Sequence, residues 1–273
     1  MNKKYKKIII CLLKVFFLIG MVHLVSAVTF DRIIEYKEVS FKANKISKEL
    51  DGCKIVLISD THQSLQGEKL KPLVDKVNSF LPDLVLLGGD FAYASEQIDE
   101  SMAVLSQIKS KDGIYGVEGN HDIYELLFKA MEDNNIKILD NNGVRINDNL
   151  FLGGVEDLVN RQPNIEKALQ DAKDDDFVLL LTHNPDVVML QDTKKADLVL
   201  AGHTHGGQIT LFGIYAPALS INWVTAYGQK FKSGWATAKS GTAVYVSNGV
   251  GTFANIPRVF ARPQVIILTL RSN

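Results

Sequence analysis

Five short polar motifs, each directly after an apolar run, constrain this chain more than any other feature of its sequence. The apolar runs are short enough to be buried strands and lie at residues 54–59, 84–87, 113–117, 177–181 and 198–201. The motifs that follow them contain Asp60-Thr61-His62, Gly89-Asp90, Gly119-Asn120-His121-Asp122, Thr182-His183 and Gly202-His203-Thr204-His205. In open α/β sheets, ligands bind beyond the carboxyl ends of the strands. The sequence therefore predicts one site built from all five motifs.

The segments between these runs predict an α/β domain with a largely parallel sheet at its start. Helical spacing of apolar residues occurs at 68–80, 95–110 and 122–133, and a short helix is expected at 165–171 after Pro163. Further strands are expected at 35–41, 137–139, 144–146, 150–152, 208–211, 243–246 and 265–268. Because no internal repeat or second boundary is visible, residues 51–273 are predicted to be one catalytic domain, with 31–50 as a connecting segment.

The first thirty residues differ from the rest. Lys3, Lys4, Lys6 and Lys7 precede an apolar run over 8–30 that only Lys14 and His23 interrupt. A run of roughly 20 apolar residues can span a membrane, and basic residues ahead of it predict a cytoplasmic N-terminus with an extracytoplasmic domain. Residues 25–27, Val-Ser-Ala, resemble a signal-peptide cleavage site. A cleaved signal peptide and an uncleaved anchor both stay open, and the length favours the anchor.

Composition excludes several classes of function. Charged residues make up 22% of the chain with a formal net charge of −1, so no nucleic-acid partner is expected. The two cysteines, Cys11 and Cys53, are poorly placed to pair, and we predict neither a disulfide nor a thiolate metal site. The sequence implies no oligomeric state.

The donor atoms of the motifs suit divalent metals. They are carboxylate oxygens, an amide oxygen and imidazole nitrogens, which favour Mn, Zn or Fe over the soft metals that prefer thiolate. Asp60 and His62 are two residues apart, as are His203 and His205, so an extended backbone points each pair to one side. Each motif alone is weak evidence, whereas their joint occurrence in this order leaves little room for chance.

The order of the motifs resembles the five signature blocks of calcineurin-like metallophosphoesterases, from about residue 51 to the end of the chain. The resemblance implies a four-layer αββα sandwich of two mixed sheets, with two metals at its loop edge. It implies a first metal held by Asp60, His62, Asp90 and His205. Asp90 would bridge to a second metal held also by Asn120, His183 and His203, and His121 would face the substrate phosphate.

The implied activity is hydrolysis of a phosphodiester, phosphomonoester or pyrophosphate bond by a hydroxide that bridges the metals. His121 would stabilise the phosphate or protonate the leaving oxygen, because an imidazole exchanges protons near neutral pH. Asp51-Gly52, the extended motif over 202–208 and Arg258-x-x-x-Arg262-Pro263 are similar to the bacterial membrane-associated YaeI/YkuE-like branch. That branch includes enzymes resembling UDP-2,3-diacylglucosamine hydrolases, and the membrane segment makes a lipid-linked substrate a further expectation.

One departure from the family is visible after Gly89-Asp90. Many relatives carry a second Asp a few residues later, but residues 91–94 are Phe-Ala-Tyr-Ala. Because that Asp is not usually a metal ligand, its absence puts the support of the site in doubt and leaves the ligands intact.

Other polar residues have two interpretations each. Asp122 could orient His121, but we expect it to cap the helix that follows. Arg258 and Arg262 could contact substrate phosphate, whose geometry guanidinium matches, or form surface ion pairs. Asp157 is expected to be a solvated loop acid. The aromatic residues between His205 and the last strands could line a lipid-facing cleft, but we expect core packing for Tyr215, Trp223, Phe231 and Trp235.

Two other classes of function remain as alternatives. The first is a non-catalytic membrane protein that binds metal for stability or docking, and the complete ligand set argues against it. The second is a mononuclear zinc hydrolase of the metallo-β-lactamase type. Such enzymes continue a His-x-His pair into x-Asp-His, whereas His203-Thr204-His205 continues into two glycines.

Overall fold

Two six-stranded mixed sheets form the body of the protein. The computed structural model describes residues 3–62, 64–91 and 95–273. The first sheet has the order β1-β12-β2-β3-β4-β5, with bounds Glu35–Lys42, Gln264–Arg271, Lys54–Ile58, Leu84–Leu87, Ile114–Gly116 and Lys137–Ile138. The second has the order β10-β11-β9-β8-β7-β6, with bounds Gly234–Thr237, Ala243–Val246, Leu198–Ala201, Phe177–Leu181, Leu150–Gly154 and Asn142–Asn147.

Both sheets are parallel at the centre and antiparallel at particular pairs. In the first sheet β2, β3, β4 and β5 run parallel, and β12 is antiparallel to β2. In the second sheet β7, β8, β9 and β11 run parallel, and the edge strands β6 and β10 are antiparallel to their neighbours. Parallel strands need crossover connections, which explains the helices between β2, β3, β4 and β5. The carboxyl ends of the central strands therefore meet at one edge of the sandwich.

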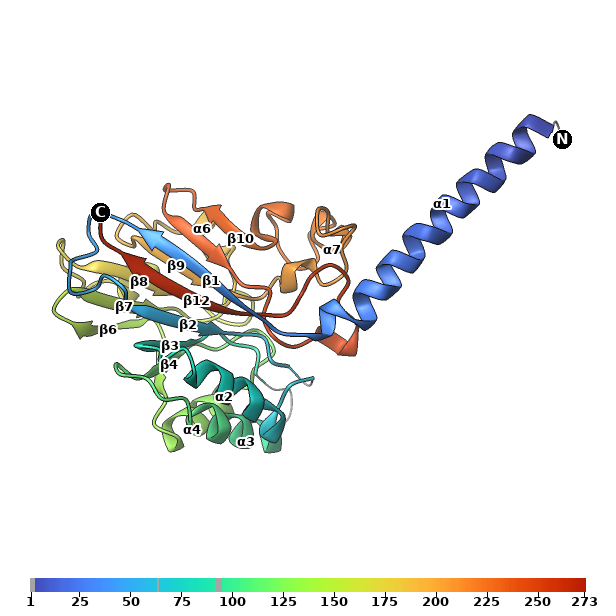
Figure 1. Ribbon diagram of the computed structural model, residues 1–273. Coiled ribbons are helices and arrows are strands. Elements are labelled where there is room, and N and C mark those ends of the chain that lie inside the picture. Colours follow the sequence, from blue (N-terminus) through green and yellow to red (C-terminus); the bar gives the residue numbers. More distant parts are fainter. Residues whose placement is uncertain (1–2, 63, 92–94) are drawn as a thin grey trace.

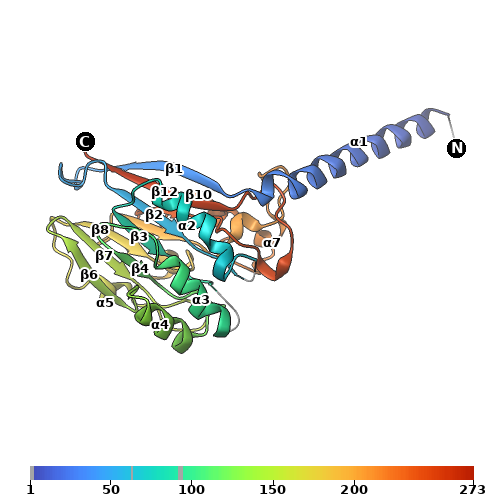
Figure 2. The same ribbon diagram turned by 60° about the horizontal axis from the view of Figure 1, so that its bottom comes forward.

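Helices cover the outer face of each sheet, which gives four layers (Figures 1 and 2). The first sheet packs against α2 (Lys71–Asn78), α3 (Ser95–Leu105) and α4 (Tyr124–Asp133). The second packs against the shorter α5 (Ile165–Ala168) and α6 (Val187–Leu190). A third apolar cluster fills the space between the sheets. The expected αββα sandwich is confirmed, and its central strands β3, β7, β8 and β9 are buried on both faces, as their continuous apolar runs require.

The helix α1 (Lys3–Val28) projects away from the sandwich (Figure 1). Within the segment from Lys3 to Arg32, an 18-residue window has a mean hydropathy of 2.7, so the segment is long and apolar enough to cross a membrane. A 3₁₀ turn at Phe30–Arg32 leads into β1. β1 pairs along its whole length with β12, from Glu35 opposite Gln264 to Lys42 opposite Arg271. The segment after the helix thus contributes the edge strand of the first sheet.

The expected strand over 208–211 is wrong. In this region only isolated bridges form, between Ile209 and Val259 and between Leu211 and Tyr215. A 3₁₀ turn at His205–Gly207 precedes them, and Gln208 and Phe212 have positive φ of 53° each, which an extended strand does not allow. Further short turns are α7 (Pro217–Ser220) and the 3₁₀ turns at Gly67–Leu70, Gly228–Phe231 and Phe253–Asn255.

Candidate metal centre

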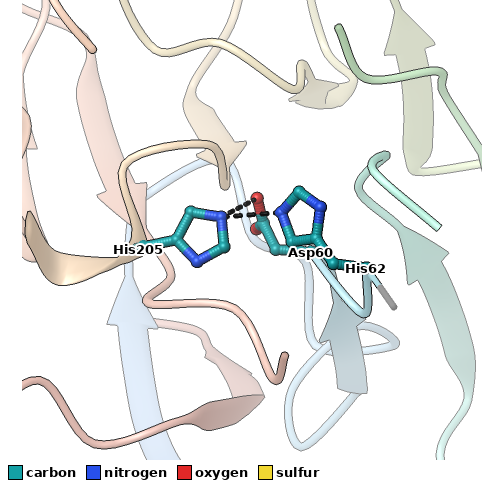
Figure 3. Close-up of side chains that lie close together, drawn as sticks. All are labelled: Asp60, His62 and His205. Carbon is teal, nitrogen blue, oxygen red and sulfur yellow. Dashed lines mark hydrogen bonds and ion pairs between the residues drawn. The ribbon is translucent and has the colours of Figure 1, made fainter. Parts of the chain in front are cut away.

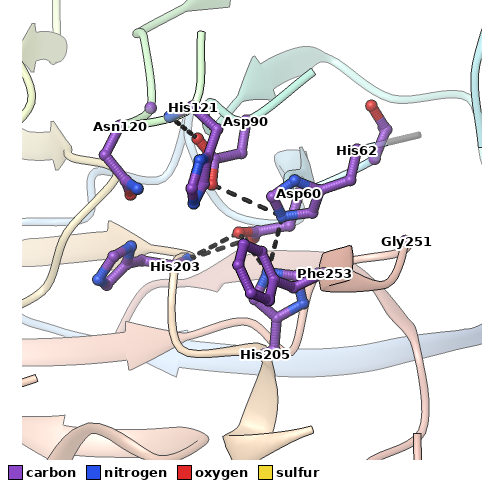
Figure 4. A network of polar contacts seen from close by, with 12 residues as sticks. Asp60, His62, Asp90, Asn120, His121, His203, His205, Gly251 and Phe253 are labelled. Carbon is purple, nitrogen blue, oxygen red and sulfur yellow. Dashed lines mark hydrogen bonds and ion pairs between the residues drawn. The ribbon is translucent and has the colours of Figure 1, made fainter. Parts of the chain in front are cut away.

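The seven predicted ligands come together at the edge where the strands end. Asp60 and His62 follow β2, Asp90 follows β3 and Asn120 follows β4, all in the first sheet. The second sheet contributes the rest, with His183 after β8 and both His203 and His205 after β9. The site therefore spans both sheets, and their packing against each other decides its geometry (Figure 4).

The first cluster consists of Asp60, His62 and His205, all buried (Figure 3). The Nε2 atoms of His62 and His205 are 2.8 Å apart, and His205 Nε2 is 3.4 Å from Asp60 Oδ1. One donor atom from each of the three residues lies within 4.8 Å of the others. Two imidazole nitrogens and a carboxylate oxygen that converge in this way are a donor set for a divalent cation.

The second cluster consists of Asp90, His183 and His203, also buried. His183 Nε2 lies 3.3 Å from Asp90 Oδ2, 3.2 Å from His203 Nδ1 and 3.2 Å from Asn120 Oδ1. Asp90 Oδ2 is also 3.6 Å from His62 Nε2 of the first cluster. Asp90 therefore lies between the two clusters, as the bridging position requires.

His183 and His203 each use one ring nitrogen for a hydrogen bond to a backbone carbonyl. Their other ring nitrogens face each other. His183 Nδ1 lies 2.8 Å from the carbonyl oxygen of Gly88, and His203 Nε2 lies 2.9 Å from that of Val224. A carbonyl only accepts, so in neutral imidazoles these nitrogens carry the protons. The facing atoms, His183 Nε2 and His203 Nδ1, then both hold lone pairs at 3.2 Å. A divalent cation between the two nitrogens would satisfy both lone pairs, as would a proton on His183, and carbonyls that orient histidine in this way are typical of metal sites.

Electrostatics also favour positive charge in the centre. Burial raises the pKa of Asp60 to about 6 and lowers the pKa of His203 to about 4. Burial would also raise the pKa of Asp90 and lower that of His183, but their mutual attraction outweighs it. The pKa of Asp90 is held below its ordinary value and that of His183 well above. Without an ion, a proton on His183 supplies the positive charge that the carboxylates attract, and a divalent cation would supply it more completely.

The backbone of the site adopts unfavourable conformations. Five of the predicted ligands have positive φ, with values of 56°, 47°, 61°, 71° and 53° at Asp60, His62, Asp90, His203 and His205. Such conformations are rare outside glycine, cost on the order of 1–3 kcal/mol each and cluster at functional sites. Glycine allows the close approach of the loops, because a Cβ on Gly89 would lie 2.6 Å from the nitrogen of Gly119.

Asp122 is not the helix cap that the sequence predicts. Ile123 occupies the N-cap position of α4, and no side-chain cap is formed there. The Asp122 carboxylate instead accepts backbone N–H bonds from Asp90, Phe91 and Gly119 at 2.7, 2.7 and 2.8 Å. It ties the loop after β3 to the loop after β4. The expected loss of support from a missing second Asp concerns residues 92–94, which lie outside the described residues.

Arg258 is placed differently from the expected phosphate contact. Its side chain is 1% exposed, and its guanidinium donates to backbone carbonyls of the His205 loop and of the loop after β11. Nε donates to Gly251 at 2.8 Å, Nη1 to His205 at 2.9 Å and Nη2 to Asn248 at 2.7 Å. Through these bonds Arg258 stabilises the backbone that positions His205. Arg262 Nε donates to the carbonyl of Ile33, near the start of β1.

Asp157 is buried, so the expectation of a solvated acid is wrong. Its Oδ2 accepts backbone N–H bonds from Val159 and Asn160 at 2.7 and 3.0 Å. The Asn160 side chain in turn donates to the backbone carbonyl of Asn120 at 2.6 Å. Asp157 therefore shapes the turn that fixes the Asn120 loop, a role that spacing in the sequence does not reveal.

An open pocket of about 580 Å³ lies over the two clusters. Asp90, Asn120, His203 and His205 line its floor, and His121 lines its wall beside Phe253, with ring centroids 5.2 Å apart. Most of the other lining residues are apolar: Ile209, Ala218 on α7, Trp223, Val224 and Ile256. The pocket thus combines a polar floor with apolar walls.

The aromatic residues after His205 divide between core and surface. Phe231 is buried as expected, whereas Trp223 is 83% exposed and Tyr215 and Trp235 are also exposed, so the expectation of core packing is wrong for these three. The motifs also did not reveal the wall residues Phe253 and Val224. One sequence signal could have indicated an unusual surface here, since no Asp, Glu, Lys or Arg occurs over residues 198–229.

Comparison with known proteins identifies the family of this chain. A family model described as "Calcineurin-like phosphoesterase" matches residues 53–207. The chain is 33% identical to an uncharacterized metallophosphoesterase of Helicobacter pylori over 242 residues. The matched region covers 84% of this chain and 62% of that protein. It is 30% identical over 256 residues to the uncharacterized metallophosphoesterase YkuE of Bacillus subtilis, covering 88% and 86%.

A relative from Danio rerio, a transmembrane protein with a metallophosphoesterase domain, is 29% identical over 256 residues, or 86% of this chain and 56% of that protein. The chain thus spans less than two thirds of the length of some relatives, including that from Helicobacter pylori. The chain belongs to the calcineurin-like metallophosphoesterase family.

Proposed function

We propose that this chain is a binuclear metal-dependent phosphoesterase. The first ion would be held by Asp60, His62, Asp90 and His205, and the second by the bridging Asp90 with Asn120, His183 and His203. The observation that carries the proposal is the convergence of these donors, with lone pairs facing each other, beneath an open pocket. The nitrogen and oxygen donors favour Mn, Zn or Fe.

The metal ligands, His121 and Phe253 would have different roles in the reaction. Two divalent ions in this site would clamp a phosphate, lower the pKa of water and offset the charge that builds on the phosphoryl oxygens. His121 lines the wall above Asp90, and its backbone N–H donates to Asp90 Oδ1 at 2.8 Å. From there its imidazole would contact the substrate phosphate and give a proton to the leaving oxygen. Phe253 packs beside His121 and limits the orientation of its ring.

The pocket and the N-terminal helix support a proposal for the substrate class. A phosphodiester, phosphomonoester or pyrophosphate would place its phosphate on the polar floor, and the apolar walls favour a lipid-linked group. A pyrophosphate that carries acyl chains, of the UDP-2,3-diacylglucosamine type, is the second candidate for the same reason. We propose that α1 anchors the protein with its lysines in the cytoplasm and the catalytic domain on the extracytoplasmic side.

Turnover of a soluble substrate tests the reaction class. The full chain, purified in detergent and loaded with Mn, Zn or Fe, should hydrolyse bis-p-nitrophenyl phosphate and bind two metal ions per chain by elemental analysis. A protein that binds metal but turns over neither this diester nor p-nitrophenyl phosphate with any of these metals would overturn the proposal. A stoichiometry of one ion per chain would favour the mononuclear alternative.

The variant His121→Ala separates an enzyme from a non-catalytic metal-binding protein. Because His121 lies outside the two donor clusters, the variant should keep both ions, while kcat falls about 10²- to 10⁴-fold through loss of the proton donor. His23→Ala is the matched control, since His23 lies on α1, and it should keep full activity. Equal activity of His121→Ala and the unmodified protein would exclude the proposed role of His121.

A further inference from the structure

The loops beside the pocket expose a continuous set of large apolar side chains. We name this set the apolar rim: Ile209, Leu211, Phe212, Ile214, Tyr215, Ile221 and Trp223. All are exposed, and they lie within the stretch over 198–229 that has no Asp, Glu, Lys or Arg. Elsewhere in the described part of the domain, exposed aliphatic residues such as Leu81, Val159 and Leu190 are separated in the sequence. Concentrated apolar exposure of this kind marks an interaction surface, whereas single exposed residues need no explanation.

The apolar rim contacts the membrane-length helix directly. The ring of Phe212 lies 4.7 Å from that of His23 on α1, and Phe260 lies 5.0 Å from the same His23 ring. Phe212 and Phe260 also contact each other, with ring centroids 5.6 Å apart. Both views of the molecule place α7, in the middle of the rim loops, beside the base of α1 (Figures 1 and 2). The rim therefore meets the helix at Phe212, beside Phe260.

A buried polar contact fixes the direction of the helix relative to the rim. The backbone N–H of Phe260 donates to Asp31 Oδ2 at 2.7 Å, and the Ser26 hydroxyl donates to the same carboxylate. Ser26 and Asp31 are both buried. Because a buried carboxylate without partners is costly, this contact holds the end of α1 against the loop of Phe260.

The geometry of α1 sets the depth of the rim. Residues 8–28 span about 31 Å at 1.5 Å per residue, close to the roughly 30 Å hydrocarbon thickness of a bilayer. His23 lies five residues before the end of the helix at Val28, or about 7.5 Å inside it. A residue that contacts His23 from the domain is therefore held at the boundary between head groups and acyl chains, where interfacial apolar surfaces insert by about 5–10 Å.

We propose that the apolar rim is a bilayer-docking surface that holds the mouth of the metal pocket against the lipid head groups. Ile209 and Trp223 belong both to the rim and to the pocket wall, so the docked surface continues into the site. A phosphate at head-group depth would then reach the polar floor without leaving the membrane surface. The inference rests on one part of the proposed function, namely that α1 stays attached to the domain and anchors it in the membrane.

The two tryptophans of the chain provide an internal test. Trp223 belongs to the rim, whereas Trp235 on β10 stacks on Phe41 at 5.8 Å and meets Tyr245 at 4.9 Å. Phe41 lies six residues along β1 from Glu35, about 20 Å from the strand's start near α1. The variant Trp235→Phe therefore keeps Trp223, a fluorescent reporter at the rim. The variant Trp223→Phe keeps Trp235, a reporter away from the rim.

The full chain of each variant is reconstituted in phosphatidylethanolamine–phosphatidylglycerol vesicles with or without brominated acyl chains. Bromolipid should lower the fluorescence of Trp223 about twofold and leave that of Trp235 nearly unchanged, because only the rim reaches the acyl chains. Equal fluorescence of Trp223 in both kinds of vesicle would overturn the proposal and would fit a rim covered by a second copy or by water.

Charge substitutions connect the quenching to the rim. In the Trp235→Phe background, Ile214→Glu and Ile221→Glu should reduce the quenching of Trp223, since a carboxylate resists transfer from water. Leu81→Glu is the matched control, because Leu81 is equally exposed but lies away from the rim, and it should leave quenching unchanged. Equal effects of all three substitutions would overturn the assignment to the rim. The measurement needs no turnover, so its result stands apart from that of the phosphoesterase assay.

Discussion

The floor of the pocket and the apolar rim both depart from the usual rule that polar side chains are exposed and apolar side chains are buried. On the floor, polar and ionisable side chains are buried, among them Asp90, His203 and His205. On the rim, large apolar side chains such as Ile214 and Trp223 are exposed to solvent in the isolated chain. Buried charge is costly without a counter-charge, and exposed apolar surface is costly without an apolar phase. Each region would therefore be stabilised by a partner outside the polypeptide: a cation on the floor and an apolar phase at the rim.

The two regions also differ in how their geometry is held. The floor is fixed by backbone N–H groups that donate to Asp122, by backbone carbonyls that accept from Arg258, and by residues at positive φ. The rim consists of loops and short turns, with isolated bridges at Ile209 and Leu211. A metal centre requires donor atoms placed within fractions of an ångström, whereas an apolar surface requires only area. The difference predicts sharp effects of substitutions on the floor and graded effects on the rim.

The largest effect is expected for Asp90→Asn. Asp90 lies between the clusters, 3.3 Å from His183 and 3.6 Å from His62, so its charge serves both. The variant should lose about 10³-fold or more in kcat/KM, equivalent to about 4 kcal/mol. Its bound metal, measured by elemental analysis, should fall below two ions per chain. Asp192→Asn, at an exposed site, is the control and should change neither quantity. Full metal occupancy and activity in Asp90→Asn would contradict the bridging position.

Arg258→Met tests the support beneath the floor. Removal of the guanidinium leaves the carbonyls of His205, Asn248 and Gly251 without their buried donor, which should lower the free energy of unfolding by about 3 kcal/mol. Chemical denaturation in detergent measures it. Arg262→Met, at a half-buried side chain with one backbone acceptor, should cost less, about 1 kcal/mol. If Arg258→Met instead kept its stability and raised only KM, Arg258 would be a substrate contact after all.

Asp122→Asn should weaken the metal site by an intermediate amount. The amide keeps one acceptor oxygen but turns an NH₂ group toward backbone N–H donors that the carboxylate now binds. Loss of such outer support typically costs about 10- to 100-fold in metal affinity. Titration with Zn or Mn against a chelating dye would measure it. Asp99→Asn, on α3, should leave the affinity unchanged. Unchanged affinity in Asp122→Asn would show that the two loops hold their positions without this carboxylate.

The smallest effect is expected on the rim. Ile214→Glu should lower turnover of a vesicle-embedded fluorescent phosphodiester about threefold to tenfold, because weaker docking reduces contact with the lipid. Its turnover of soluble bis-p-nitrophenyl phosphate should stay within about twofold, since Ile214 does not line the pocket. Val159→Glu should affect neither substrate. Equal losses on both substrates would mean that the rim shapes the catalytic floor and is not a separate surface.

Much of the fold was predictable because its strands are short apolar runs with polar ends. The runs at 84–87, 177–181 and 198–201 coincide with β3, β8 and β9. The prediction failed over 208–211, where positive φ at Gln208 and Phe212 bends the chain away from an extended path. Nothing in that tetrapeptide distinguishes it from a strand, since its alternation is that of one. The conformation is set by the turn at His205–Gly207.

The sequence by itself determined which residues could bind metal, because donor chemistry and the position after a strand are local properties. The tertiary structure decided how those donors divide into two clusters, since the division depends on two sheets packed face to face. It also decided the roles of Asp122 and Arg258, whose partners lie on other loops, and the burial of Asp157. Long-range hydrogen bonds and the exposure of the rim depend on which segments meet in space, and that information is not carried by any single stretch of the chain.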